Sequence, residues 1–387
     1  MVADVDLDHP DGRRVHVSEV ARGLGGIAAV DLVVHGGDPG IAGVHHVAVP
    51  RWSGRWRIVA LTAVAACILV RRRRPAGILY LRHDPGTVAI ALLARLLRYR
   101  LVLEVNAVSV GIHRNPPEGV PARIKAAVKA VGDRCALRSA QAVVVVSAEL
   151  REDVARLRRD GAATVHVIAN GADTRTFHPM DAAAAAARLG LDAGDEHVVF
   201  TGTLTWWMDL DTLLAAFALV AGRRPAARLV IVGDGPERDR LEQRSVTSGG
   251  RVLFTGAIAD RARVADYVAA ATVCVAPTDP AMRTARSPLK TLEYLAVGRP
   301  VVATDLPGNR DPVVATGGGV LVPPSDAPTL AEAILSLLDD PQRAAGIGSA
   351  AATIVAAEHS WSAVVGRIEP LLQLRGARAQ PAASARP

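Results

Sequence analysis

One segment in the second half of the chain has residues suited to holding a phosphorylated ligand. It reads SPLKTLEYLAVGRPVVA over residues 287–303. Pro288 is typical of the first turn of a helix, and the free backbone N–H groups at a helix start attract phosphate. Glu293 would lie at least one turn further in, where its carboxylate can accept hydrogen bonds from two ribose hydroxyls. The segment therefore predicts a nucleotide site.

Two glycine-containing turns in the same half point to the same kind of ligand. They read TGTL over residues 201–204 and VGDGPE over residues 232–237. Each leaves a predicted strand and leads into a predicted helix, where glycine lets the backbone approach a ligand closely. A tight strand-to-helix turn explains either one taken alone.

Two other motifs resemble cofactor or metal sites but are better explained as helix caps, and a third motif is absent. GLGGIA at 23–28 fits the G-x-G-x-x-A pattern of dinucleotide sites, but it ends a predicted helix instead of following a strand, which indicates a helix C-cap. The chain has no G-x-x-x-x-G-K-[ST] phosphate loop. DLD at 209–211 resembles a metal-binding D-x-D, but its place at a helix start favours capping. We expect no metal and no bound cofactor.

Composition bounds the class of protein. The 387 residues are 50% hydrophobic and 21% charged, which suits a globular protein of two domains and excludes a wholly disordered one. Three scattered cysteines make neither a metal site nor a disulfide framework. The longest uncharged apolar run, Ile58–Val70, is shorter than the roughly 20 residues of a membrane span. The N-terminus is acidic and polar, unlike a signal peptide. We expect a cytoplasmic protein.

Short apolar runs alternate with longer helical stretches in both halves of the chain. The strand-like runs cover 29–34, 77–81, 101–105, 142–146, 165–168, 198–201, 227–232, 252–254, 272–276, 300–303 and 319–322. Strands separated by helices indicate parallel sheets, so we predict an α/β protein with two doubly wound domains. Ligands of such sheets bind at the carboxyl ends of the strands, and the cleft between the domains is the expected site.

Composition shifts suggest where these domains begin and end. We place the first domain at 1–178, a linker in the alanine-rich stretch 179–195 and the second domain at 196–360. A last helix at 361–374 is expected to pack back on the first domain. The low-complexity tail 375–387, RGARAQPAASARP, is expected to be disordered.

In this order, the segments VVVVSAELR (143–151), VIANGADTRTFHP (167–179), VVFTGTL (198–204), LVIVGDGPE (229–237) and SPLKTLEYLAVGRPVVATD (287–305) resemble family-4 glycosyltransferases of the GT-B fold. The resemblance covers roughly residues 10–370. It implies a retaining transfer of a sugar from a nucleotide diphosphate-sugar donor, held by the second domain, to an acceptor held by the first. It implies no metal. No strong strand precedes residue 10, where the family has one.

The resemblance also assigns roles to single residues. On the donor side, Glu293 would hold the ribose and Gly202 would lie beside the diphosphate, with Thr203 next to it. His83, in YLRHDP, matches a histidine near the donor sugar and the reaction centre. The remaining donor-side positions are Asp234 and Gly235 near the base, and Arg286, Ser287, Pro288 and Leu289 at the helix start. The acceptor-side positions are Gly12 and His16, which resemble a glycine loop, and Glu104 and Asn106 after a strand.

The sequence departs from the family pattern at the charged residues that surround the diphosphate. The family's diphosphate-binding Arg and Lys would fall near Thr203 and Met208, and the first Glu of its paired motif at Ala285. Arg283, Arg286 and Lys290 could compensate, with Lys290 as the diphosphate ligand and stabiliser of the leaving group, or as a solvated helix lysine. Two alternatives follow: a nucleotide-sugar-binding partner subunit with little turnover, and a sugar-nucleotide epimerase on the same fold.

A basic and apolar stretch near residue 60 raises the question of partners. Trp52 and Trp56, with neighbouring arginines, precede the apolar run 58–70, and four arginines follow at 71–74. Such a segment suits peripheral contact with the anionic inner face of a membrane, but a buried helix with a solvated end is the favoured interpretation. The acceptor would be a saccharide, a lipid-linked molecule or a small molecule. Because no basic patch is interleaved with aromatics, we expect no nucleic-acid partner.

Overall fold

The computed structural model describes residues 1–9, 12–50, 54–72, 77–106, 120–158, 164–246, 250–281 and 289–372. They divide into two compact units. The first contains residues 1–170 together with the chain from Trp361 onward, and the second contains Gly171–Ser360. We describe each unit by itself.

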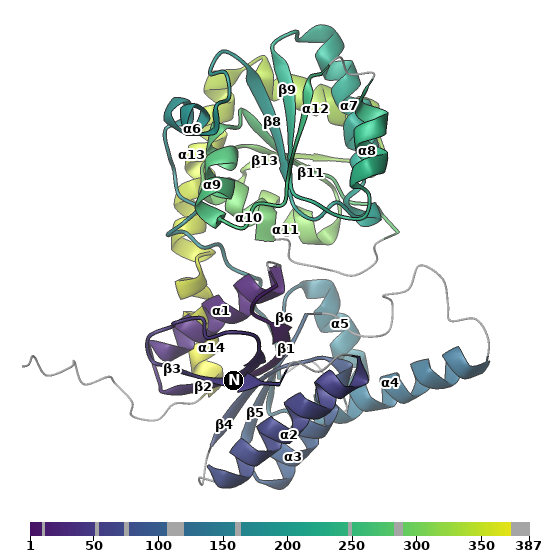
Figure 1. Cartoon of the computed structure of the whole chain (residues 1–387), viewed down its shortest axis with the longest axis vertical. Helices are drawn as coiled ribbons and strands as arrows, with labels where there is room; N and C mark the ends of the chain where they lie inside the picture. The colour runs from purple at the N-terminus through teal and green to yellow at the C-terminus, as the bar shows by residue number, and fades with distance from the viewer. Residues whose placement is uncertain are drawn as a thin grey trace, which may run out of the picture. The chain divides into compact units, whose positions relative to one another are not determined.

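The first unit is built on a seven-stranded parallel sheet with the order β3-β2-β1-β4-β5-β6-β7 (Figure 1). Its strands are β1 (Val2–Asp6), β2 (Val30–His35), β3 (Val44–Val49), β4 (Ile78–Arg82), β5 (Arg100–Val105), β6 (Ala142–Val145) and β7 (Val165–Val167). Its helices are α1 (Gly12–Gly25), α2 (Arg55–Arg71), the 3-10 turn η1 (Pro85–Thr87), α3 (Val88–Leu96), α4 (Val120–Ser139), α5 (Ala148–Leu157) and α14 (Trp361–Leu372).

The second unit repeats this architecture with six parallel strands in the order β10-β9-β8-β11-β12-β13. Its strands are β8 (Glu196–Thr201), β9 (Ala227–Val232), β10 (Val252–Gly256), β11 (Val273–Ala276), β12 (Val301–Thr304) and β13 (Gly319–Val322). Its helices are α6 (Ala182–Leu189), η2 (Trp206–Met208), α7 (Leu210–Arg223), α8 (Arg238–Ser245), α9 (Arg261–Ala270), α10 (Leu289–Ala296), α11 (Pro307–Thr316), α12 (Ala327–Leu338) and α13 (Pro341–Glu358).

Both faces of the second sheet are buried, which explains its continuous apolar strands. Val198 and Phe200 pack into one hydrophobic cluster, while Val199 between them packs into the other. Side chains alternate between the faces of a strand, so a parallel sheet covered on both sides needs apolar residues at every position. The order of the strands changes direction at β8, between β9 and β11. Ligands of such sheets bind at the carboxyl ends beside this switch point.

The structure divides the chain at other residues than we predicted. The alanine-rich segment expected as a linker forms α6, which packs on α9 of the second unit; Ala185 and Ala186 are buried there. Small side chains allow this close approach, and Asp181 caps the helix by accepting from the Ala184 N–H at 2.7 Å. The boundary accordingly lies at Asn170/Gly171. The tail at 375–387 lies outside the described residues.

The N-terminal strand is another correction. Residues before 10 showed no strong strand pattern, yet β1 lies inside the sheet and pairs with β2 and β4. Its alternating aspartates hid it, because Asp4 and Asp6 break the apolar run that a buried parallel strand normally shows. The last helix, α14, belongs to the first unit, where it contacts α1 and β5. In the described ranges, no helix is both long and apolar enough to cross a membrane.

Candidate active site

Two glycine turns interlock at the carboxyl ends of β8 and β9. Gly202 and Gly233 have φ angles of 143° and 140°, a region open mainly to glycine. A Cβ atom on Gly233 would lie 1.9 Å from the Gly202 carbonyl oxygen. The Gly202 N–H donates to the Val232 carbonyl at 2.9 Å. The turns therefore form one rigid edge, made of backbone, at the switch point of the sheet.

The predicted base-side residues belong to the same edge. A Cβ atom on Gly235 would lie 2.4 Å from the Leu204 carbonyl oxygen, and the Leu204 N–H donates to the Asp234 carbonyl at 2.9 Å. The Asp234 carboxylate accepts from the Gly235 N–H at 2.7 Å and from Arg238 at 3.2 Å. Asp234 thus shapes the turn, whereas Thr203 is exposed at its surface.

Lys290, in the first turn of α10, places its amine against the first glycine turn. The Nζ atom lies 3.1 Å from the Met208 Sδ and 4.1 Å from the centre of the Phe200 ring. A Cβ atom on Gly202 would come within 2.7 Å of this nitrogen. Burial disfavours the charged amine and lowers the pKa of Lys290 to about 7, while nearby Glu293 acts in the opposite direction. A cation next to a glycine backbone is suited to a phosphate.

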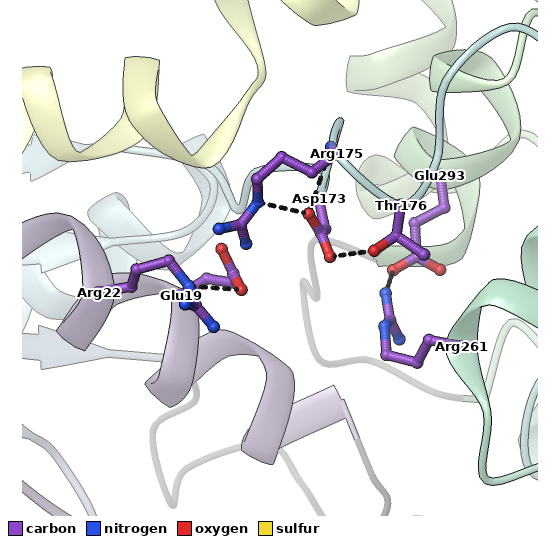
Figure 2. A network of polar contacts seen from close by, with 7 residues as sticks. All are labelled: Glu19, Arg22, Asp173, Arg175, Thr176, Arg261 and Glu293. Carbon is purple, nitrogen blue, oxygen red and sulfur yellow. Dashed lines mark hydrogen bonds and ion pairs between the residues drawn. The ribbon is translucent and has the colours of Figure 1, made fainter. Parts of the chain in front are cut away.

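Glu293 lies one turn further along α10 and is 7% exposed. Its Oε1 accepts from the Arg261 Nη2 at 2.6 Å, and the Arg261 guanidinium stacks 4.9 Å from the centre of the buried Phe177 ring. Figure 2 shows Arg261 reaching from the start of α9 to Glu293. Because the guanidinium holds one oxygen of the Glu293 carboxylate, the orientation of the second oxygen is fixed as well.

Asp173 and its neighbours form a second polar group close to Arg261 (Figure 2). Asp173 accepts from the Thr176 hydroxyl at 2.8 Å and from the Arg175 Nε at 3.2 Å. Burial raises the pKa of Asp173, but the Thr176 hydrogen bond and the charges of Arg175 and Arg261 outweigh it and hold that pKa below its usual value. The segment leading to Phe177 is therefore firmly anchored.

Several predicted donor-side residues lie outside the described residues. They are Arg286, Ser287 and Pro288, together with Arg283 and Ala285. Leu289 begins α10 and is half-buried. Of the D-x-D motif, Asp209 occupies the N-cap position of α7 but accepts from the Thr212 hydroxyl at 2.8 Å, and Asp211 pairs with Arg240. Among the residues described, no group of three His, Cys, Asp or Glu side chains could hold a metal ion.

The first unit brings two of the predicted acceptor-side residues, His16 and Asn106, against a third, Glu104. This carboxylate is 1% exposed, receives the Tyr80 hydroxyl at 2.6 Å and pairs with the His16 Nε2 at 2.6 Å. Asn106 donates to it as well. Burial opposes its ionisation, but His16, Arg82 and Tyr80 prevail and lower the pKa of Glu104 to about 2. Glu104 is thus a buried anion that organises its neighbours.

The other predicted residues of this unit occupy separate positions. The His16 Nδ1 contacts the Asn170 Oδ1 at 2.9 Å. This contact links the residues around Glu104 to Asn170, the residue at which the chain leaves the first unit. Gly12 is the exposed first residue of α1. His83 directly follows β4; its N–H donates to the Glu104 carbonyl at 2.7 Å, while its ring turns to Asp133 of α4.

Sequence reasoning missed Arg261 and Asp133. Arg261 directly follows the helix-capping Asp260, so its sequence context suggested a surface helix start. A signal for Asp133 was present, since it is the sole acidic residue of the 20-residue helix α4. A lone carboxylate on an otherwise basic helix often has a partner inside the fold.

Comparison with known proteins gives consistent matches. The family described as glycosyl transferases group 1 matches residues 195–340. The chain is 29% identical over 304 residues to alpha-D-kanosaminyltransferase of Streptomyces kanamyceticus, with 76% of each covered. It is 31% identical over 296 residues to D-inositol 3-phosphate glycosyltransferase 1 of Catenulispora acidiphila, covering 73% of this chain and 67% of that one. A GDP-mannose-dependent phosphatidylinositol monomannoside mannosyltransferase of Corynebacterium glutamicum is 30% identical, but only 56% of its length is matched.

Solved structures resemble the whole architecture. Sucrose-phosphate synthase from Thermosynechococcus elongatus superposes with a TM-score of 0.75 at 23% identity, covering 93% of this chain and 92% of that one. Anabaena HepE, in complex with UDP and glucose, superposes with a TM-score of 0.74 at 21% identity, with 96% and 98% covered. At these identities the likeness concerns the fold.

Proposed function

This chain belongs to the group 1 glycosyltransferases of the GT-B fold, and from that premise we propose how its residues divide the work. The second unit would hold a nucleotide diphosphate-sugar, and the first would present an acceptor hydroxyl to it. Transfer would proceed with retention at the sugar carbon and without a metal. The observation that carries the proposal is the convergence of Gly202, Lys290 and Glu293 at one edge of the second sheet.

Lys290 would supply a positive charge that this chain lacks at Thr203 and Met208. The family's two diphosphate-binding cations fall at Thr203 and Met208 in this sequence. The Lys290 amine touches Met208 from a different helix, so a positive charge can still reach that position. The glycine edge lets a diphosphate approach this amine closely, and the start of α10 adds the positive end of a helix dipole.

Glu293 would bind the ribose of the same nucleotide. Its carboxylate is nearly buried and already oriented by Arg261, which reduces the entropy that binding must overcome. UDP, GDP and ADP share the ribose, so this contact selects for a ribonucleotide and leaves the base to other residues. Together, Lys290 and Glu293 would set the nucleotide along the edge of β8.

The chemistry would then depend on stabilising the departing diphosphate. Breaking the sugar–phosphate bond generates an oxocarbenium-like sugar, as in other glycosyl chemistry. Lys290 and the α10 dipole would lower the energy of the leaving anion, and a departing phosphate oxygen would take the acceptor proton. His83 would orient the donor sugar. Acceptors named for the relatives, such as phosphatidylinositol mannosides, suggest a saccharide or lipid-linked hydroxyl near Gly12, His16 and Asn106.

Calorimetric titration with UDP, GDP, ADP and TDP, followed by transfer assays with the matching sugar nucleotides, tests this proposal. We expect micromolar binding of one nucleotide, and a glycosylated product when a saccharide or lipid-linked acceptor is added. Binding without any product from the purified chain would favour a partner subunit. Conversion of the donor without acceptor would favour an epimerase. If none of the four nucleotides binds, the donor site is wrong.

Peripheral membrane contact is the second part of the proposal, and it rests on three neighbouring helices of the first unit. In the structure α3 contacts both α2 and α4, so the three form one layer (Figure 1). Each carries exposed large apolar side chains: Trp56, Val59 and Val70 on α2, Leu92 and Leu96 on α3, and Val120, Ile124, Val128 and Val131 on α4. Their single acidic residue, Asp133, is fully buried, whereas arginines and lysines are exposed around the apolar ones.

Such a layer fits an anionic bilayer surface, because apolar side chains enter the interface while basic ones meet the lipid headgroups. We expect the protein to sediment with vesicles that contain phosphatidylglycerol, less strongly at high salt, and hardly at all with phosphatidylcholine vesicles. Replacing Ile124 and Val128 by serine should reduce this binding severalfold. The matched control is Val314→Ser, which removes a similarly exposed valine from the second unit. Equal sedimentation of all three proteins would contradict a role for α4.

A further inference from the structure

His83 and Asp133 form a buried pair that the proposed donor chemistry does not explain. The His83 Nε2 lies 3.0 Å from the Asp133 Oδ1, and the two residues are 8% and 0% exposed. They come from different elements, since His83 follows β4 and Asp133 lies on α4. Burying two ionisable side chains costs desolvation free energy, and such pairs are often kept because they fix one orientation of their groups.

The pair determines which ring nitrogen of His83 carries the proton. An ionised carboxylate can only accept hydrogen bonds, so a neutral imidazole that pairs with it carries its proton on Nε2. Nδ1 then keeps a lone pair and can only accept. This atom is buried and has no hydrogen-bond partner among the residues that the structure describes. Buried polar atoms nearly always find a partner, and at a ligand site that partner is often the ligand.

We propose that Asp133 is a positioning residue, which holds His83 so that Nδ1 accepts a hydrogen bond from a sugar hydroxyl of the substrate. The inference rests on the proposed function, which places a sugar at the end of β4. His83 is then a substrate-binding residue that needs one tautomer, and Asp133 acts only through it. A pair that merely stabilises the fold would require neither the tautomer nor the free Nδ1.

Nitrogen-15 NMR of the imidazole groups reads the tautomer without any substrate. The His83 signals are identified by their loss in His83→Gln. We expect protonated Nε2 and unprotonated Nδ1 in the native protein. Asp133→Asn, whose amide can also donate to Nε2, should populate the other tautomer. Protonated Nδ1 in the native protein, or an unchanged tautomer in Asp133→Asn, would overturn the proposal even if the chain proves to be an active transferase.

Transfer assays test the consequence for the substrate. Asp133→Asn should lower kcat/KM for transfer about tenfold or more, while the Kd of the nucleotide stays within about twofold. The matched control is Asp31→Asn, which alters a half-buried aspartate of the same unit that pairs with His45 and Arg72, and it should leave both values unchanged. Unaltered transfer by a folded Asp133→Asn would contradict the positioning role.

Two His83 variants separate the nitrogens and do not depend on how Asp133→Asn folds. The amide of asparagine lies where Nδ1 lies, and that of glutamine reaches the position of Nε2. His83→Asn should therefore retain more transfer activity than His83→Gln. The reverse order would show that Nε2 is the important atom and overturn the proposal. Failure of the native protein to bind nucleotide would instead refute the proposed function, while the tautomer remains measurable.

Discussion

Replacing Glu293 by glutamine is expected to weaken nucleoside diphosphate binding about tenfold or more, while inorganic pyrophosphate binds as before. Glutamine keeps the size of the side chain but loses the charge that strengthens hydrogen bonds from ribose hydroxyls. Hydrogen bonds to charged groups contribute about 1.5–3 kcal/mol each, and a tenfold loss corresponds to about 1.4 kcal/mol. Calorimetric titration of native and variant proteins with the best-binding nucleotide and with pyrophosphate measures both effects.

Glu332→Gln is the matched control for this change. Glu332 also accepts from an arginine of the second unit, Arg223, at 2.6 Å, but the pair is exposed on α7 and α12. Its loss should not alter nucleotide affinity. If Glu293→Gln binds the nucleotide as tightly as the native protein does, ribose does not contact this carboxylate. An equal loss for pyrophosphate would mean that the substitution disturbs Lys290 instead.

The parallel-sheet core was predictable because its physical signature is local. The runs at 198–201 and 227–232 are apolar at nearly every position, as two covered faces demand, and they form β8 and β9. The glycine turns that follow them were predictable for the same reason. A positive φ and a close backbone approach both restrict the residue at that position, and Gly202 and Gly233 meet these conditions.

Elements whose partners lie far away in the chain were not predictable in this way. The aspartates of β1 interrupt its apolar pattern because they pair outside the strand: Asp4 binds Arg57 of α2 at 2.8 Å. The alanines of α6 resembled a linker because nothing nearby indicates that they face α9. Composition alone does not distinguish a flexible alanine-rich segment from a tightly packed helix.

The same contrast between local patterns and distant partners holds for the residues of the candidate site. The place of Glu293 on α10 was predictable from its motif, but its partner Arg261 is 32 positions earlier in the chain, and 50 positions separate His83 from Asp133. Pattern reading identifies residues that sit on the correct edge of a sheet. It does not identify the second residue that orients them, because that residue is brought close only by the packing of a helix on the sheet.

Lys290 gives rise to the second large effect, a pH dependence of nucleoside diphosphate binding. Burial lowers the pKa of Lys290 to about 7, so the free protein has largely lost this proton at pH 8. A bound diphosphate favours the charged amine, so binding takes up a proton. The Kd of the nucleotide should therefore rise above pH 7, by up to about tenfold per pH unit until the pKa of the complex is reached.

Titrations between pH 7 and 9 measure this, because the phosphate itself has a second pKa of about 6 and stays ionised there. Lys290→Arg keeps its charge, so its Kd should not change over this range. Lys290→Met should bind weakly throughout, and the nucleoside without phosphates should show no pH dependence in any variant. A native Kd that is constant from pH 7 to 9 would mean that the amine does not meet the diphosphate.

As the pH rises above 7, the free energy of unfolding should increase while the affinity for the nucleotide falls. This difference distinguishes loss of binding from misfolding. The unfolded chain holds the Lys290 proton up to about pH 10.5, and the folded chain only up to about 7. Between these values the unfolded state binds more protons, so this lysine costs least stability at high pH and most at pH 7 and below. Lys290→Met removes that cost and should raise the melting temperature at pH 6 to 7. Lys290→Met should therefore be more stable than the native protein and bind its nucleotide less well, as expected if the lysine is buried in order to meet an anion.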